Sequence, residues 1–362
     1  MPLSSSVTSD DGFGGICTFV INADQDVFKF SMTIDIHISM SAVQTVTKYV
    51  KDARLVYSAL NGVVVIYKPA SLHFNNMRDT LINNLCRDLN DMYTRPTRKH
   101  IAIVGETNKH MRVVVHDSFA DHPLITGPRY QPNDFKLATS RILQRDMCGV
   151  VLCGINKGNR LIHKLKTSRS LRFYRVKGLL GEATDNYFHT GKVVEKSTYA
   201  HVRRGHLDKL CSSMQSSHQK KMFELSGVDI QSQAAYELAI KGPIRPADPN
   251  IPMVYTIRCV DFSPPEFTLE IVCTNEYDLY LKTIIHELGL KLRSNATCTQ
   301  ILCTQDSLFN IRHALLTKHW TLQHIVNNMQ MCQKIIDRNE NCLDPENSAL
   351  VEPVPYGNLS NE

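Results

Sequence analysis

Residues 149–177 read GVVLCGINKGNRLIHKLKTSRSLRFYRVK, and this stretch decides the class of fold. It begins with an unbroken apolar run, Val150–Cys153, of the kind that forms a buried strand. The basic segment Ile162–Ser170 then predicts a helix, and the aromatic and branched residues at Phe173–Val176 predict a second strand. A strand, a helix and a strand in one short stretch indicate a domain in which both kinds of element share a core.

The patterns on both sides of this stretch continue to mix strands and helices. Strands are predicted at Val63–Tyr67, Ile101–Val104 and Met111–Val115. Helices are predicted at Met77–Asp91, Leu207–Met214, Ser232–Ile240, Leu279–Leu290 and, near the end, Ile311–Ile336. Because these elements do not follow a regular β-α repeat, we expect an α+β class of fold.

The first residues carry two further patterns. Residues 27–39 alternate between apolar and polar side chains, which predicts a strand, and from Met40 to Tyr57 apolar residues recur at helical spacing. The second segment is basic and amphipathic, as mitochondrial presequences are, but residues 1–39 contain five aspartates and one lysine, unlike a presequence. Two interpretations stay open, a lineage-specific extension and a true start at Met40.

The composition excludes several classes of protein. With 362 residues, of which 43% are hydrophobic and 21% charged, the chain can bury a large core. No stretch approaches the roughly 18 uncharged apolar residues of a membrane span, so we expect none. The closest cysteine pairs, Cys148/Cys153 and Cys298/Cys303, have four residues between them, which is not the common spacing of a zinc or redox motif. We therefore expect reduced thiols and no metal.

Positive charge is concentrated in one part of the chain. The net charge is only +6, yet residues 136–177 contain eleven Lys or Arg residues and a single acid, Asp146. The basic residues are Lys136, Arg141, Arg145, Lys157, Arg160, Lys164, Lys166, Arg169, Arg172, Arg175 and Lys177. Clustered cations of this kind favour a polyanion such as RNA, because they release its counterions on binding. A solvated basic helix face is the alternative interpretation.

Six segments carry more specific information, and they occur in one order over roughly residues 55–320. They read LNGVVVIYKPASLHF (60–74), HPLITGPRY (122–130), GVVLCGINKGNRLI (149–162), LRFYRVKGLLGEATDNYFHTGKVVEK (171–196), SHQKKMFELSGVDIQSQAAYELAIKGPIRP (217–246) and YLKTIIHELG (280–289). Together they resemble the motifs of the TruB family of pseudouridine synthases, and most closely its mitochondrial animal branch. The resemblance does not depend on any single short motif.

The resemblance implies the pseudouridine synthase fold, an α+β domain with a mixed, mostly antiparallel sheet, flanking helices and a basic RNA cleft. It divides the chain into an extension (1–52), a TruB-like domain (53–310), a helical region (311–342) and a tail (343–362) that we expect to be disordered. The residues after Ile311 are too few and too helical for the small β-rich RNA-binding domain of bacterial relatives. RNA recognition would therefore rest on the cleft alone.

The resemblance also implies a chemistry that needs no metal and no cofactor. The bond from C1′ to N1 of a uridine is broken, the base turns, and it is rejoined through C5. The base must first leave its stack. In the family one aspartate acts on the sugar, an aromatic ring stacks against the base, and an arginine keeps the aspartate ionised and oriented.

The residues at these catalytic positions are only partly those of the family. Tyr174 matches the stacking tyrosine, although an ordinary strand tyrosine is the alternative interpretation. Lys282 occupies the position of the family's arginine. The aspartate position, five residues before Gly149, is Gln144. A neutral amide is neither a nucleophile nor a base near neutral pH. Asp146 is the fallback carboxylate if the loop is rebuilt, and otherwise it forms a local salt bridge.

Other positions complete the predicted site. The residues predicted to contact RNA are Lys68, Pro69, Arg141, Arg145, Lys164, Arg172 and Tyr236. Two more departures from the family are Ser71, where a glycine is expected, and Leu302-Cys303, where an arginine pair is expected. Loss of the carboxylate together with its arginine suggests a site released from catalysis. His286, one turn after Lys282, is interpreted as a surface residue.

Two functions follow from these observations. The first is a TruB-type RNA pseudouridine synthase with a degraded active site, which acts on mitochondrial messenger or transfer RNA in the matrix. The second is a catalytically inactive RNA-binding or assembly factor of the same fold, with ribosomal RNA and mitochondrial ribosome-assembly proteins as partners. An error in the gene model over residues 131–147, where the match is poorest, is a third explanation for Gln144.

Overall fold

The computed structural model describes residues 52–93, 99–106, 108–118, 123–240, 242–339 and 350–351. All of them belong to one compact unit, Val43–Glu362. The strand predicted at residues 27–39 lies outside the described residues, as does most of the helix predicted from Met40. Helix α1 (Ala53–Ala59) covers the end of that second segment.

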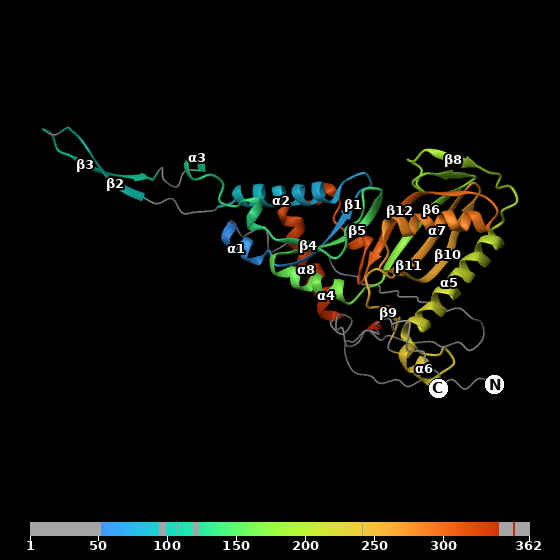
Figure 1. Ribbon diagram of the computed structural model, residues 1–362. Coiled ribbons are helices and arrows are strands. Elements are labelled where there is room, and N and C mark those ends of the chain that lie inside the picture. Colours follow the sequence, from blue (N-terminus) through green and yellow to red (C-terminus); the bar gives the residue numbers. More distant parts are fainter. Residues whose placement is uncertain are drawn as a thin grey trace, which may run out of the picture. The chain divides into compact units, whose positions relative to one another are not determined.

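The centre of the unit is an eight-stranded mixed sheet (Figure 1). Its strands run in the order β1 (Gly62–Lys68), β5 (Met147–Ile155), β12 (Ala296–Asp306), β6 (Arg172–Leu180), β11 (Glu266–Thr274) and β10 (Met253–Ser263). The short strands β4 (Leu137–Thr139) and β13 (Phe309–Asn310) pair with β5 and β12. Every pair is antiparallel except β5 with β12. The predicted α+β class with a mixed, mostly antiparallel sheet is confirmed.

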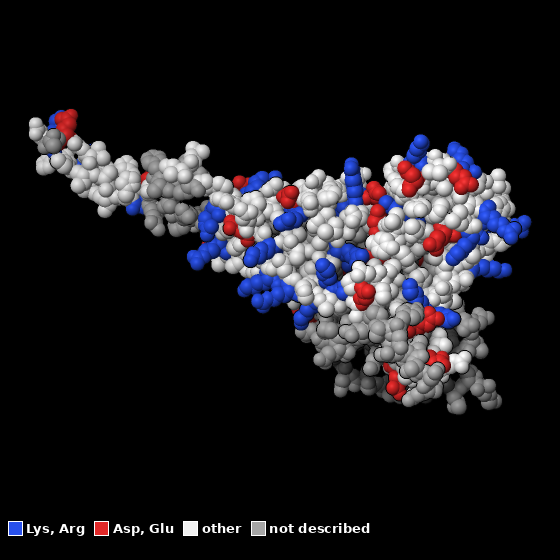
Figure 2. All heavy atoms as spheres, in the orientation of Figure 1, with Lys and Arg blue, Asp and Glu red and all other residues white. Residues whose placement is uncertain are grey.

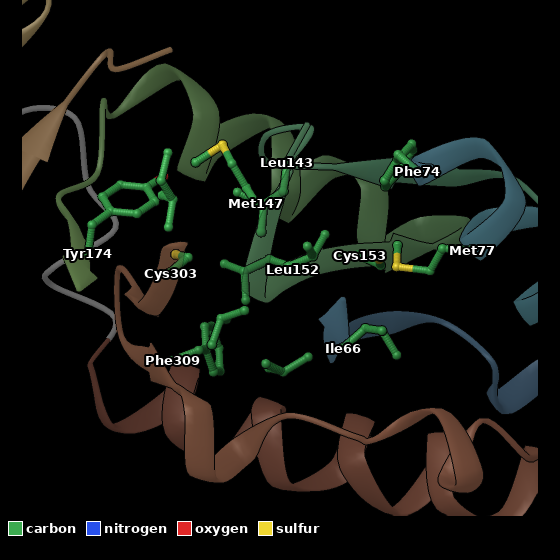
Figure 3. Close-up of a cluster of buried hydrophobic side chains, with 14 of the residues drawn as sticks. Ile66, Phe74, Met77, Leu143, Met147, Leu152, Cys153, Tyr174, Cys303 and Phe309 are labelled. Carbon is green, nitrogen blue, oxygen red and sulfur yellow. The ribbon is translucent and has the colours of Figure 1, made fainter. Parts of the chain in front are cut away.

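Burial explains why β5 and β6 look different in the sequence. All nine residues of β5 are buried, so its pattern is an unbroken apolar run. Strand β6 buries every second residue, and Arg172, Tyr174 and Val176 share its inner face. One buried cluster connects these strands with the helices, and Figure 3 shows Ile66, Met77 and Leu152 within it.

Helices cover the sheet from several sides. Helices α4 (Asn159–Thr167) and α8 (Leu322–Arg338) contact β1, α7 (Asp278–Lys291) contacts β12, and α5 (Arg204–Ser226) contacts β10. Helix α2 (Phe74–Asn90) buries residues at helical spacing, including Met77, Leu81 and Leu85, and contacts α8. Two shorter helices are α3 (Pro123–Thr126) and α6 (Gln233–Ile240). In the described part of the chain, none of the helices has the length and apolar character that would let it cross a membrane.

Three two-stranded sheets complete the fold. They are β2 (Lys99–Val104) with β3 (Arg112–Asp117), β7 (Glu182–Thr184) with β8 (Val193–Lys196), and β9 (Arg245–Pro246) with β14 (Leu350–Val351). The last pair places two residues of the tail that we expected to be disordered in a short strand. The rest of that tail, and residues 340–342 before it, lie outside the described residues.

Some elements differ from the sequence-based predictions. Strands β10, β11 and β12 were not predicted, although they form half of the sheet's main path. The final helix begins at Leu322 and not at Ile311, because residues 311–319 form two short 3-10 turns. Between those turns Leu315 bridges to Ile66, which fixes this segment to the edge of the sheet.

The sheet register brings three parts of the sequence together. Cys303 of β12 lies opposite Gly149 of β5 on one side and opposite Tyr174 of β6 on the other. Gly149 has a φ of 121°, and a Cβ at this position would overlap the main chain of Cys303, so only glycine fits. The segment that precedes β5 is thereby held beside Tyr174, and in the view of Figure 3 Met147 lies between Tyr174 and Leu143.

Candidate active site

A small cavity lies where the segment before β5, strand β6 and the start of α7 meet. Its volume is about 80 Å³. It is lined by Arg141, Ile142, Leu143, Gln144, Met147, Tyr174, Glu276, Tyr277 and Asp278. We call residues 141–147 the site loop. The cavity therefore brings together three residues predicted from the sequence, namely Gln144, Tyr174 and Arg141, with two acids that were not predicted.

The side chain of Lys68 binds the main chain of the site loop. The side chain is fully buried, at 0% exposure. Its Nζ donates to carbonyl oxygens of Gln144 (2.9 Å), Met147 (2.7 Å), Pro69 (3.2 Å) and Arg145 (3.4 Å). Burial lowers the pKa of Lys68 from 10.5 to about 8. An ammonium enclosed by carbonyls is not accessible to a phosphate, so the RNA contact predicted for Lys68 is wrong and its role is to position the loop.

Ser71 adds a second contact to the same loop. Its main-chain N–H donates to the Arg145 carbonyl at 2.9 Å. The φ of Ser71 is 69°, in the left-handed region that favours glycine. This backbone conformation explains why the family motif has a glycine at the position of Ser71. Pro69, also predicted to contact RNA, is half-buried between Lys68 and this turn.

Lys282 holds the site loop through a side chain. Its Nζ lies 2.8 Å from Asp146 Oδ2 and 2.8 Å from Asp278 Oδ2, and 4.8 Å from the centre of the Phe188 ring. Burial alone would lower the pKa of Lys282, but the hydrogen bonds with both acids raise it. The ammonium is therefore charged, and it faces two carboxylates.

The structure decides which partner Asp146 takes. The local salt bridge with Arg141 or Arg145 considered from the sequence is absent among the described contacts, and Lys282 is the partner. Asp146 nevertheless does not line the cavity, whereas Gln144 does. The fallback carboxylate and the family's aspartate position thus face different surroundings, although only one residue separates them.

Glu276 organises the inner wall of the cavity. The Tyr174 hydroxyl donates to Glu276 Oε1 at 2.8 Å, and Arg172 Nη1 donates to the same oxygen at 2.7 Å. Arg172 also pairs with Asp306 at 3.2 Å, which in turn accepts from Ser140 at 2.8 Å. Burial and the Glu276 charge raise the pKa of Tyr174, so its hydroxyl stays neutral.

This network corrects the role predicted for Arg172. The residue is 6% exposed and its guanidinium is occupied by two carboxylates, so it is not available to RNA. Although burial alone would lower the pKa of Arg172, those carboxylates raise it. Arg172 instead fixes Glu276, and through it Tyr174. Glu276 was missed from the sequence, and the signal was a pair of acids, Glu276 and Asp278, just before the third motif.

The remaining residues predicted to contact RNA are more exposed than Lys68 and Arg172. Arg141 is half-buried at the cavity and donates to the main-chain oxygen of Glu276. Arg145 and Lys164 are exposed, and Figure 2 shows Lys and Arg side chains gathered where Figure 1 places α1 and α4. Tyr236 of α6 is 63% exposed, in a shallow groove that shares no residue with the cavity.

His286 does not lie at the surface as expected. Its ring is half-buried and stands 4.8 Å from the ring of Tyr187. The ring nitrogen Nδ1 is buried without a hydrogen-bond partner among the described residues. The side chain packs against Tyr187, and it is not among the residues that line the cavity.

Comparisons with known proteins agree with the motifs. Residues 136–278 match the family described as TruB family pseudouridylate synthase (N terminal domain). The chain is 36% identical over 307 residues to "Pseudouridylate synthase TRUB2, mitochondrial" of Xenopus tropicalis, covering 83% of this chain and 94% of that protein. It is 35% identical over 275 residues to the human protein of the same name, covering 74% of this chain and 82% of the relative.

More distant similarities were found as well. "tRNA pseudouridine synthase B" of Geotalea uraniireducens is 24% identical over 199 residues, covering 55% of this chain and 63% of that protein. A solved archaeal Nop10-Cbf5 complex of the box H/ACA sRNP shares 10% identity with a TM-score of 0.38, covering 78% of this chain and 60% of that chain. That structural likeness is too low to bear on the fold by itself. The extent and identity of the sequence matches show that this chain belongs to the TruB family of pseudouridine synthases and has its α+β fold.

Proposed function

We propose that the protein is a TruB-type RNA pseudouridine synthase that acts on mitochondrial RNA, with an active site weakened at Gln144. The observation that carries this proposal is a cavity that is lined both by Tyr174 and by Asp278, whose carboxylate is bound to Lys282. The two relatives with 36% and 35% identity are both named mitochondrial pseudouridylate synthases, which supports both the reaction and the compartment.

The isomerisation makes clear demands on such a site. A flipped uracil needs an apolar and aromatic wall, which Leu143, Met147 and Tyr174 provide. The sugar needs a carboxylate that is ionised near neutral pH. Gln144 occupies the family position but is neutral, and losing a group of this kind lowers a rate by about 10³ to 10⁶. We therefore expect slow turnover compared with a relative that has aspartate at this position.

A second function is favoured by one specific feature. Side chains at the wall of the cavity already bind one another. Glu276 is bound by Arg172 and by Tyr174, and the Gln144 side chain is neutral. A protein with this arrangement could bind an unpaired uridine without converting it. In that case it would act as an RNA-binding factor in mitochondrial RNA or ribosome maturation.

The two functions differ in one measurement. Purified protein is incubated with uridine-containing mitochondrial transfer RNA, and pseudouridine is quantified in the digested RNA. We expect slow formation of pseudouridine and an increase of at least about 10-fold in Gln144→Asp, because the carboxylate is restored where the family has it. Gln323→Asp, an exposed position on α8, is the matched control and should leave the rate unchanged.

The other outcomes are equally informative. RNA binding that weakens steeply with salt, without any product from the wild type, supports the RNA-binding factor, whether or not Gln144→Asp makes pseudouridine. Absence of salt-dependent RNA binding contradicts both functions. The exposed residues Arg145 and Lys164 provide the charge for this binding, so Lys164→Ala should weaken it.

A further inference from the structure

The geometry points to Asp278 as the carboxylate that replaces the family's aspartate in this chain. The inference rests on the proposed function, because it names the residue that acts on the sugar. Three carboxylates lie around the site loop, those of Asp146, Glu276 and Asp278. Their contacts differ enough to separate a reactive group from two supporting ones.

Glu276 is fully engaged. Its Oε1 accepts from Tyr174 and from Arg172, its Oε2 is 3.9 Å from the Cys273 thiol, and its side chain is only 2% exposed. A carboxylate that already accepts several hydrogen bonds in a buried site is stabilised as it stands. Glu276 therefore fixes the tyrosine and does not attack a substrate.

Asp146 is separated from the cavity. One of its oxygens is bound to Lys282, but Asp146 is not among the residues that line the cavity. Its side chain is 34% exposed and follows Arg145 in the turn at the end of the site loop. Asp146 is therefore placed to neutralise Lys282 and to fix the loop.

Asp278 differs from the other two carboxylates in its contacts. It lines the same cavity as Gln144 and Tyr174. Its Oδ2 is held by Lys282 at 2.8 Å, while its Oδ1 is buried and has no hydrogen-bond partner in the described part of the chain. A buried acceptor without a partner is rare in native structures, because its desolvation is not offset. One oxygen of Asp278 is thus fixed and the other is left free.

The surroundings of this carboxylate include a helix N-terminus and a buried cation. Asp278 is the first residue of α7, where the helix dipole favours a negative charge. Lys282 lies four residues later on the same helix and carries one positive charge against two acids. Together these three side chains carry one net negative charge.

The proposed step balances without any co-reactant. Oδ1 of Asp278 attacks C1′ of the flipped uridine, and the electrons of the C1′–N1 bond leave with the base. After the base turns, C5 attacks C1′, the bond from C1′ to Oδ1 breaks, and the carboxylate is restored. C5 loses one proton and N1 gains one, so the product is an isomer of the substrate.

The test compares three variants of the full-length protein in single-turnover assays with the same transfer RNA. Asp278→Asn should lower the rate of pseudouridine formation by at least about 10³ and change the Kd for RNA by less than about 3-fold, because it removes only the charge. Asp146→Asn should lower the rate by less than about 10-fold, since Lys282 keeps Asp278 in place. Asp208→Asn removes the acid of another i,i+4 pair, with Arg204 on α5, and should change neither quantity.

Each result has one meaning. If the wild type makes pseudouridine and Asp278→Asn keeps the rate, Asp278 is not the carboxylate while the proposed function stands. If the wild type makes no pseudouridine, both are overturned. If Asp278→Asn does not fold, Asp278→Glu decides, since it keeps the charge but moves the reactive oxygen by one methylene. That variant should slow the reaction by at least about 10-fold, and a full rate would overturn the inference.

Discussion

Lys68 and Lys282 are both buried lysines that hold the site loop, but their surroundings are opposite in kind. Lys68 is enclosed by neutral main-chain carbonyls, whereas Lys282 faces two carboxylates. The pKa of Lys68 is lowered to about 8 by burial, and that of Lys282 is raised by its acids. The first lysine therefore sets where the loop lies, and the second sets the charge beside the cavity.

The largest effect should come from removing the charged partner. In Lys282→Met, Asp146 and Asp278 lose the cation that they share, and we expect a loss of about 3 to 5 kcal/mol in the free energy of unfolding, measured in urea. In the triple variant with Asp146→Asn and Asp278→Asn, most of this loss should be recovered, because no acid is left unpaired. A triple variant as unstable as Lys282→Met would show that packing against Phe188, and not charge, is what Lys282 contributes.

Removing the other lysine should have a smaller effect. Lys68→Met leaves several carbonyls without their donor, although Arg145 keeps the Ser71 N–H, and we expect a loss of about 2 to 3 kcal/mol. The site loop should also become more mobile, which faster amide hydrogen exchange at residues 144–147 would reveal. Lys177→Met, at an exposed position of β6, is the matched control and should change stability by less than about 0.5 kcal/mol.

A change of pH should distinguish the two lysines. The native pKa of Lys68 is about 8, below its unfolded value, so above pH 8 the unfolded chain binds a proton that the native protein does not. The stability of the wild type relative to Lys68→Met should therefore rise by up to about 1.4 kcal/mol per pH unit between pH 8 and 10.

Lys282 should behave differently over the same range. Its native pKa is raised, so its stabilising effect is fully present below the unfolded value near 10.5 and is lost only as the pH rises through the native value. The difference between the wild type and Lys282→Met should thus stay constant between pH 8 and 10. Equal slopes for both lysines would contradict the contrast in their surroundings.

The two lysines also show how far the sequence can lead. The apolar run of β5 and the periodicity of α7 were sufficient to predict both elements, and the motifs predicted that Gln144 and Tyr174 would meet. The role of Lys68 could not be predicted, because its partners are main-chain oxygens that converge only after folding. Asp278 was missed for a related reason. It lies outside the motif residues, and its contact with Lys282 depends on where α7 begins.

The smallest expected effect concerns the turn that joins Lys68 to the site loop. Ser71 has a φ of 69°, which is strained for a residue with a Cβ, so Ser71→Gly should stabilise the protein by about 0.5 to 1 kcal/mol in urea unfolding. Ser213→Gly, at an exposed helical position of α5, should instead destabilise it by about 0.5 kcal/mol. If both variants lost stability alike, the Ser71 side chain would have to support the loop in a way that its main-chain contact with Arg145 does not explain.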